Sequence, residues 1–284
     1  MSASTSETTP KLISETRGRV ALLTLNRPEI RNAVDADTMN QLREALLTAE
    51  AHPEIRVVLL TGTGGAFCSG ADIKSALQAR LTPEKAMQIL LESYGPALRT
   101  IRNLKLPVIA AVDGMAAGIG LDLALACDLR LASPQAGFAE LFIRVGLIPD
   151  GGGTWMLPRL IGEARAKEMI FTGETVDAPT ALHWGLVNRV LGSGVSSGEE
   201  SSGSEEVSRQ SEFLTQALAF AAKLSQQNPD ALRFGKRAIH EGAGGTYEDA
   251  LTREAGYQRR IFDGPWGFEG FQAFLEKRKP GWMD

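Results

Sequence analysis

Three glycine-rich turns constrain the fold of this 284-residue chain more than any other feature. The first, residues 61–74 (TGTGGAFCSGADIK), and the second, residues 113–120 (DGMAAGIG), each follow an apolar run typical of a buried strand. The third, residues 146–154 (GLIPDGGGT), places Asp150 in a rigid bend that opens a helix. Turns with so little side-chain bulk between strands and helices are typical of α/β folds.

Such turns also have a chemical use. The first N–H groups of a helix have no partner within the helix, and its dipole favours negative charge there. Two amides aimed at one point form an oxyanion hole, which stabilises a carbonyl oxygen that gains charge in a transition state. The alternative is that the glycines only turn the chain and that Asp150 stabilises a bend. We interpret the three turns together as those of an enzyme in which Asp150 is an acid/base group.

Apolar periodicity predicts an α/β core followed by helices. The predicted strands are 20–25, 57–61, 108–112, 129–132 and 186–190, and the predicted helices are 36–51, 83–103, 120–126, 164–171, 178–183, 207–224, 229–240 and 247–262. We therefore expect a disordered tail at 1–10, an α/β core at 11–190, a flexible Gly/Ser/Glu insertion at 191–206 and a helical C-terminal subdomain at 207–284.

Composition narrows the class of protein. A chain with 43% hydrophobic and 23% charged residues can bury a large core. Cys68 and Cys127 lie in separate segments, so we expect reduced thiols, a cytoplasmic protein, and a Cys68 that is buried rather than nucleophilic. The three histidines form no ligand motif, so we expect no metal site. A net charge of −4 argues against nucleic-acid and membrane-surface partners, and no apolar segment is long enough to span a bilayer.

Six ordered segments resemble the crotonase superfamily, also called the enoyl-CoA hydratase/isomerase family. They are residues 23–28 together with 32–33, then 67–74, 107–128, 146–159, 181–190 and 273–278. The resemblance implies an α/β fold of ββα units wound into a right-handed spiral, with C-terminal helices that complete an acyl-CoA pocket. It also implies an acyl-CoA thioester as substrate, no separate cofactor, and homotrimers that often pair into hexamers.

In that family two backbone N–H groups hold the thioester oxygen, and the matching positions here are Ala71 and Ile119. Ile119 stands where many members have Gly. A backbone donor survives this change, but the branched side chain must narrow the pocket or point away from it.

The family's acid/base carboxylates occupy three recurrent places. The first falls on Asp122, one helical turn beyond Ile119, where hydratases usually carry Glu. The position of their second Glu matches Phe142, with Glu140 two residues earlier, so the glutamate pair that positions water for hydration is broken here. An aspartate early in a helix is also favourable on dipole grounds alone, so Asp122 has a structural alternative.

The third place falls on Asp150. It resembles the aspartate of the dienoyl-CoA isomerases and of the ring-epoxide isomerases of phenylacetate breakdown, and residues 146–158 are most similar to the latter group.

The resemblance also suggests residues that contact the substrate and its coenzyme A portion. They are Arg27, Arg31, Gly70, Asp72, Ile73, Lys74, Gly118, Phe274 and Lys277. The basic residues among them suit the phosphates of coenzyme A, although each could also be an ordinary solvated charge.

These observations favour an enzyme that stabilises a thioester enolate and shuttles a proton through Asp150, with Asp122 as a possible helper, to isomerise an unsaturated acyl-CoA. One alternative is hydration of a 2-enoyl-CoA through Asp122 and a water held by Glu140. An alternative of another class is a non-catalytic subunit that binds coenzyme A or acts as a scaffold.

Overall fold

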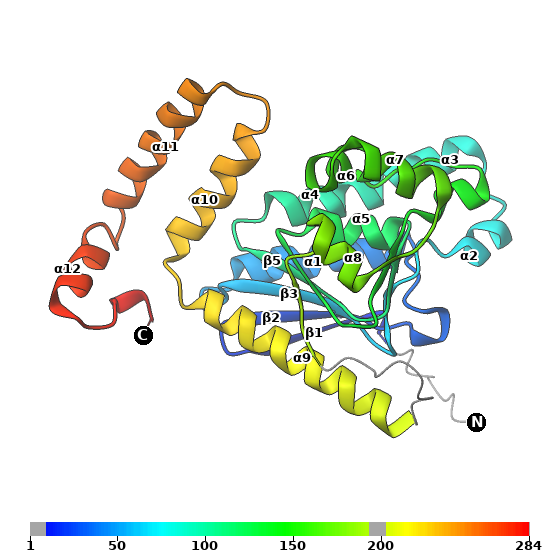
Figure 1. The fold of residues 1–284 in the computed structure, drawn as a ribbon, viewed down its shortest axis with the longest axis horizontal. Coiled ribbons are helices and arrows are strands. Elements are labelled where there is room, and N and C mark those ends of the chain that lie inside the picture. Colours follow the sequence, from blue (N-terminus) through cyan, green and yellow to red (C-terminus); the bar gives the residue numbers. More distant parts are fainter. Residues whose placement is uncertain (1–9, 193–202, 284) are drawn as a thin grey trace, which may run out of the picture.

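The computed structural model describes residues 10–192 and 203–283 (Figure 1). Its larger sheet has six strands in the order β1-β2-β3-β5-β7-β10. The strands are β1 (Leu12–Arg17), β2 (Val20–Leu25), β3 (Val57–Gly62), β5 (Val108–Val112), β7 (Leu129–Ala132) and β10 (Arg189–Val190). The hairpin β1-β2 is antiparallel, and the pairs from β2 onward are parallel.

The smaller sheet has the order β4-β6-β8-β9, in which only the last pair is antiparallel. Its strands are β4 (Ala66–Cys68), β6 (Met115–Ala117), β8 (Gly137–Ala139) and β9 (Val176–Asp177). The strands β4, β6 and β8 each follow a strand of the larger sheet along the chain, and helical turns follow them. This repeat confirms the predicted crotonase-like spiral of ββα units.

The helices of the core lie on one side of the larger sheet, some of them directly over it and others beyond its edge (Figure 1). They are α1 (Ala36–Ala51), α2 (Ile73–Gln78), α3 (Pro83–Ile89), α4 (Gly95–Asn103), α5 (Ile119–Ala126), α6 (Gly153–Ile161), α7 (Glu163–Thr172) and α8 (Ala178–Trp184). Every residue of α5 is buried, as expected for a helix that is apolar on all sides. The site residues at its N-terminus therefore stand on a rigid element.

The other face of the larger sheet is covered by α9 (Gly203–Ser225), drawn in yellow in Figure 1. Phe213, Ala217 and Ala221 of this helix pack on a second apolar cluster that includes Leu59 and Ile109. Three further helices then extend away from the core: α10 (Pro229–Gly242), α11 (Tyr247–Phe262) and α12 (Glu269–Glu276) (Figure 1). We call α10, α11 and α12 the C-terminal arm.

Both ends of the predicted insertion, 191–206, are part of the described structure. Its first two residues are held: the Leu191 amide donates to the Ala132 carbonyl at 2.9 Å, and the Gly192 amide donates to Gln216 Oε1 at 3.0 Å. The helix expected from 207 begins four residues earlier, at Gly203. Residues 193–202, and residues 1–9 of the predicted tail, lie outside the described residues.

Two other element boundaries differ from the prediction. The strand expected at 186–190 is only β10, because the left-handed Gly185 ends α8 and the chain then turns. The helix expected at 83–103 is helical throughout, but its middle, Leu90–Tyr94, is a π-helical turn between α3 and α4. Within residues 10–192 and 203–283, no helix combines the length and the apolar character needed to cross a membrane.

Candidate active site

Two of the glycine-rich turns meet at one edge of the smaller sheet. The strands β4 and β6 are parallel neighbours, so the turns that follow them leave from the same edge. A Cβ on Gly70 would lie 3.2 Å from the Ala117 carbonyl oxygen, and a Cβ on Gly120 would lie 2.2 Å from the Cys68 carbonyl oxygen. Glycine at these two positions therefore lets the turns pack backbone against backbone.

The amides of Ala71 and Ile119 are free to bind a ligand. Val34 forms a β-bridge that uses the Gly70 carbonyl and the Asp72 amide, both at 2.9 Å, and leaves the amide between them unused. Gly118, with φ of 53°, leads into α5, so the Ile119 amide belongs to the first turn. Within the described residues, neither amide has a hydrogen-bond acceptor. Two unused amides are one requirement of the oxyanion hole that we predict at these positions.

The side chain of Ile119 points away from solvent. It is only 2% exposed, and its Cδ1 would lie 2.4 Å from a Cβ on Gly151. The branched residue thus packs under the third glycine-rich turn. The backbone amide of Ile119 is thus left to a ligand, while its side chain packs against the turn that carries Asp150.

Asp122 is buried beneath the same turn. Its Oδ2 accepts the Gly151 amide at 2.9 Å. Burial raises the pKa of Asp122, the Gly151 amide opposes this shift, and the negative charge of Asp150 adds to it. The Gly153 amide also favours the charged form, although it does not reach hydrogen-bond geometry with Asp122.

Asp150 is exposed in the bend, between the buried Pro149 and the half-buried Gly151. Enough protein surrounds its carboxyl group that partial burial raises its pKa. Gly152, with φ of 106°, then leads the chain into α6. A carboxyl group that is accessible and less acidic than usual is suited to proton transfer near neutral pH.

Glu140 is the third carboxyl group of the site. Its pKa is raised by burial and further by the charges of Asp122 and Asp150. The neighbouring Phe142 occupies the position that the resemblance assigns to a second glutamate. Its ring packs over the second glycine-rich turn, with Cε2 3.7 Å from where a Cβ on Gly118 would be. We refer to Asp122, Glu140 and Asp150 as the carboxyl cluster.

Tyr94 has no distinctive sequence signal, yet it borders the site. It lies at the end of the π-helical turn and donates a hydrogen bond of 2.9 Å from its hydroxyl to the Val34 carbonyl, which is part of the bridge to Ala71. Burial and nearby carboxylates, Asp150 among them, raise the pKa of Tyr94. Its helical run contains no motif, so only the fold reveals this position.

Cys68 packs inside the first turn. It is buried, its thiol lies 3.8 Å from the Gly70 carbonyl oxygen, and burial raises its pKa to about 12. A thiol with so high a pKa is a poor nucleophile. In the described parts of the chain, no group of three or more ligating side chains could hold a metal ion.

Arg27 and Asp72 contact each other rather than lying open to a ligand. Arg27 Nη2 lies 2.9 Å from Asp72 Oδ2, and Arg27 Nη1 donates to the Ala33 carbonyl at 2.8 Å. Asp72 also accepts the Ser75 amide and caps α2. These contacts hold the turn that carries Ala71 and explain the positions of both residues without a ligand.

The other residues predicted to contact coenzyme A lie on two separate parts of the chain. Arg31, Ile73 and Lys74 are exposed beside the first turn. Phe274, 83% exposed, and Lys277 lie on or just after α12, at the opposite end of the molecule from α2 (Figure 1). One copy of the chain does not bring these two groups together.

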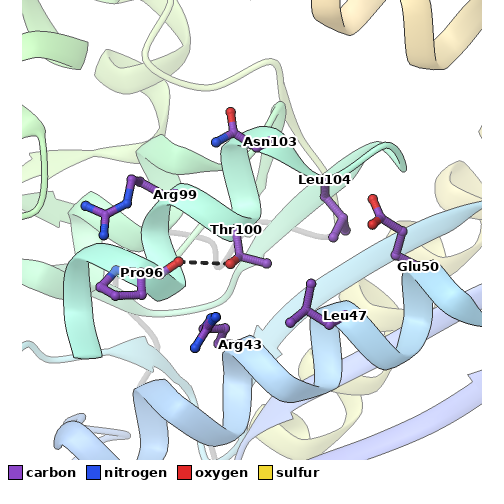
Figure 2. A pocket seen from close by; sticks show the side chains of 8 residues that line it. All are labelled: Arg43, Leu47, Glu50, Pro96, Arg99, Thr100, Asn103 and Leu104. Carbon is purple, nitrogen blue, oxygen red and sulfur yellow. Dashed lines mark hydrogen bonds between the residues drawn. The ribbon is translucent and has the colours of Figure 1, made fainter. Parts of the chain in front are cut away.

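A surface groove of about 430 Å³ lies between α1 and α4, away from the carboxyl cluster. Figure 2 shows Arg43, Leu47 and Glu50 on one helix, with Pro96, Arg99, Thr100, Asn103 and Leu104 facing them. None of the predicted catalytic or oxyanion-hole residues lines this groove. The predicted site residues therefore lie on the glycine-rich turns and not in this groove.

Comparison with known proteins agrees with this geometry. The profile described as enoyl-CoA hydratase/isomerase matches residues 15–202. A probable enoyl-CoA hydratase of Rhodobacter capsulatus is 38% identical over 92% of this chain and 93% of the relative, and the 1,2-epoxyphenylacetyl-CoA isomerase of Escherichia coli is 35% identical over 95% and 97%. The crystal structure of an enoyl-CoA hydratase from Polaromonas superposes with a TM-score of 0.84 at 38% identity, covering 95% of this chain and 98% of that one.

Proposed function

Because the chain belongs to the enoyl-CoA hydratase/isomerase family and is an acyl-CoA enzyme of that family, we propose that it isomerises an unsaturated acyl-CoA through a thioester enolate, with Asp150 as the acid/base group. Relatives of comparable similarity bear both hydratase and isomerase names, so the choice between the two reactions rests on the site.

One observation carries this proposal: the carboxyl cluster contains one accessible group. Asp150 is exposed in the bend, whereas Asp122 and Glu140 are buried beneath it and Asp122 already accepts the Gly151 amide. A group that takes a proton from a bound substrate must reach it directly or through one water. We assign the base to Asp150 because it is the exposed group of the three, and its raised pKa suits it to return the proton.

The proposed reaction needs one base and two amides. The thioester oxygen accepts hydrogen bonds from the Ala71 and Ile119 amides, and Asp150 removes a proton from the carbon that lies between the thioester and the double bond. The electrons of the broken C–H bond pass to the thioester oxygen as an enolate, which the amides stabilise. Asp150 then returns the proton to a different carbon, so the double bond moves and nothing is added or lost.

Hydration of a 2-enoyl-CoA is the second candidate. The observation that favours it is that Asp122 and Glu140 lie close together, as a pair holding a water would. In that reaction Asp122 would matter more than Asp150, which would then be a bend residue.

The Asp150→Asn and Asp122→Asn variants distinguish these candidates. For the isomerase we expect Asp150→Asn to keep thioester affinity while turnover falls by roughly 10²-fold or more, because shape and polarity remain but the base is lost. Asp122→Asn should cost less. The assay is solvent-deuterium incorporation into 2-enoyl, 3-enoyl, dienoyl and aromatic thioesters, with calorimetric binding of each thioester and its free acid.

Three outcomes decide between the candidates. Exchange without water addition, lost in Asp150→Asn, supports the isomerase. Water addition that depends chiefly on Asp122 supports the hydratase. Thioester binding with neither reaction supports a subunit that binds coenzyme A without catalysis and contradicts the proposal.

A further inference from the structure

Glu140 is a fully buried carboxyl group without a hydrogen-bond partner. It is 0% exposed, and within the described residues neither Oε1 nor Oε2 meets a donor or acceptor. An ionised carboxylate in such surroundings is strongly unfavourable unless it is paired with a charge or accepts hydrogen bonds. A neutral carboxyl group needs only one acceptor for its O–H.

Asp122 offers that acceptor. Its Oδ2 is used by the Gly151 amide, but its Oδ1 is buried and has no partner among the described residues. A Cβ built on Gly153 would lie 2.6 Å from both Asp122 Oδ1 and Glu140 Oε1. The two oxygens without partners thus face the same small space, which is open because residue 153 has no side chain.

The surroundings of the two groups assign the proton to Glu140. Asp122 accepts a backbone N–H, which favours its ionised form, whereas nothing donates to Glu140. The charged groups acting on Glu140 are Asp122 of α5 and Asp150 of the bend, and both are negative. Burial and these two charges all favour the protonated acid at residue 140.

We propose that Glu140 is a positioning residue that, as a neutral acid, donates a hydrogen bond to Asp122 Oδ1. Asp122 in turn holds the Gly151 amide, and this chain of contacts fixes the bend so that Asp150 faces the space beside the Ala71 and Ile119 amides. The consequence for turnover rests on the function proposed for Asp150, but the protonation state of Glu140 does not.

Infrared spectroscopy tests the protonation state without any assay of activity. The difference spectrum of the wild type minus Glu140→Gln at neutral pH should contain the C=O stretch of one protonated carboxyl group. The control is Glu54→Gln, which alters an exposed glutamate and should give only carboxylate bands. Carboxylate bands in the Glu140→Gln difference spectrum would overturn the proposal.

Turnover separates positioning from participation in the reaction. Gln can donate to Asp122 as a neutral acid does, so Glu140→Gln should keep turnover within roughly threefold, and its turnover should fall at low pH as the wild type's does. Glu140→Leu should lower turnover at least tenfold at unchanged thioester affinity, because the bend loses its support.

Equal losses in both variants would mean that the carboxylate itself takes part in the reaction, and no loss in either would mean that the bend needs no support; both results overturn the proposal. If the Leu variant does not fold, the Gln variant and its infrared spectrum decide alone. If Asp150→Asn retains turnover, the proposed function fails, while the infrared result still reports on Glu140.

Discussion

Asp150, Asp122 and Glu140 surround one glycine bend but differ in what reaches their oxygens. Asp150 is exposed to solvent, and Asp122 accepts a hydrogen bond from a backbone amide. Glu140 has no hydrogen-bond partner among the described residues and lies close to the other two acids. Separation of the pKa values of neighbouring acids by their environments is how enzyme sites assign different tasks to the same chemical group. The sequence motif predicts Asp150 and Asp122 as site residues, but burial and partners are properties of the fold, so it could not predict the task of Glu140.

Gly153 is the residue whose size decides whether the buried pair can exist. We expect Gly153→Ala to destabilise the protein by about 1–3 kcal/mol and to lower turnover, because the new methyl group would meet carboxyl oxygens from two sides. Chemical denaturation and steady-state kinetics measure the two effects. Gly235→Ala is the matched control: this helical glycine in α10 has open space around it, so the same change should be neutral or stabilising.

The raised pKa of Glu140 predicts a pH dependence of stability. In the unfolded chain the group ionises near its ordinary value of about 4.3, whereas burial and the two aspartates keep it protonated in the folded state to higher pH. Between these values the folded state binds more protons, so the free energy of unfolding falls as pH rises, by at most about 1.4 kcal/mol per pH unit.

Glu140→Gln replaces the ionisable group with a neutral one, so it removes this fall in the free energy of unfolding with rising pH. Its melting temperature relative to the wild type should therefore increase from pH 5 to pH 8. A difference that stays constant over this interval would show that Glu140 ionises normally in the folded protein.

Secondary-structure elements differ in how far the sequence predicts them. The helix Tyr247–Phe262 and the strand Val108–Val112 are found as predicted, because the helix begins with a capping box at Thr246 and the strand is an uninterrupted apolar run. The strands β4, β6 and β8 have three residues each, too few for an alternation to be read, and β4 and β6 also lie within glycine-rich turns. The pairing of β4 with β6 aligns the turns that carry Ala71 and Ile119. The geometry of the candidate site therefore depends on strands that the local sequence pattern could not predict.

At the level of elements, Lys236 anchors α10 to the core. Its side chain is only 8% exposed, and its Nζ donates to the Ile101 and Leu106 carbonyls at 3.2 Å and to Asp128 at 2.7 Å. We expect Lys236→Met to cost about 2–3 kcal/mol, because it leaves a half-buried carboxylate without its cation. Hydrogen exchange should accelerate in α10 more than in β3 and β5.

Arg237→Met is the control for this anchor. Arg237 is the next residue of α10, and its exposed pair with Glu241 should contribute under about 1 kcal/mol. Equal effects of the two substitutions would contradict an anchoring role for Lys236.

At the scale of the whole molecule, the C-terminal arm carries exposed apolar side chains that nothing in the described part of a single copy covers. The C-terminal arm extends from the core and exposes Phe268, Phe271, Phe274 and Leu275 (Figure 1). Clusters of exposed apolar side chains on one element are typical of protein interfaces. The periodicity predicted two of the three arm helices, but the direction of the arm depends on a few long-range contacts, such as that between Arg19 and the Trp282 carbonyl, which no local pattern encodes.

We therefore expect a homo-oligomer in which the arm of one copy completes the site of another. Lys74 lies on α2 and Lys277 directly follows α12. Because these two helices are at opposite ends of the molecule, the two lysines can serve the same coenzyme A only if they come from different copies (Figure 1). Analytical ultracentrifugation should show a trimer or a larger assembly, and Phe271→Asp should dissociate it, whereas Phe171→Asp, at an exposed phenylalanine of α7, should not.

Complementation then tests which copy supplies the arm. Asp150→Asn lacks the base, and Lys277→Glu carries an arm that repels phosphate, so each variant alone should have low activity. In an assembly refolded from both, some sites combine the intact Asp150 of one copy with the intact Lys277 of another, and we expect these sites to recover activity in proportion to their statistical share. If the arm served its own chain, every site in the mixture would carry one defect or the other, and mixing would restore nothing. A mixture no more active than the average of its components would therefore place the arm with its own core and would leave the exposed aromatic residues to another role.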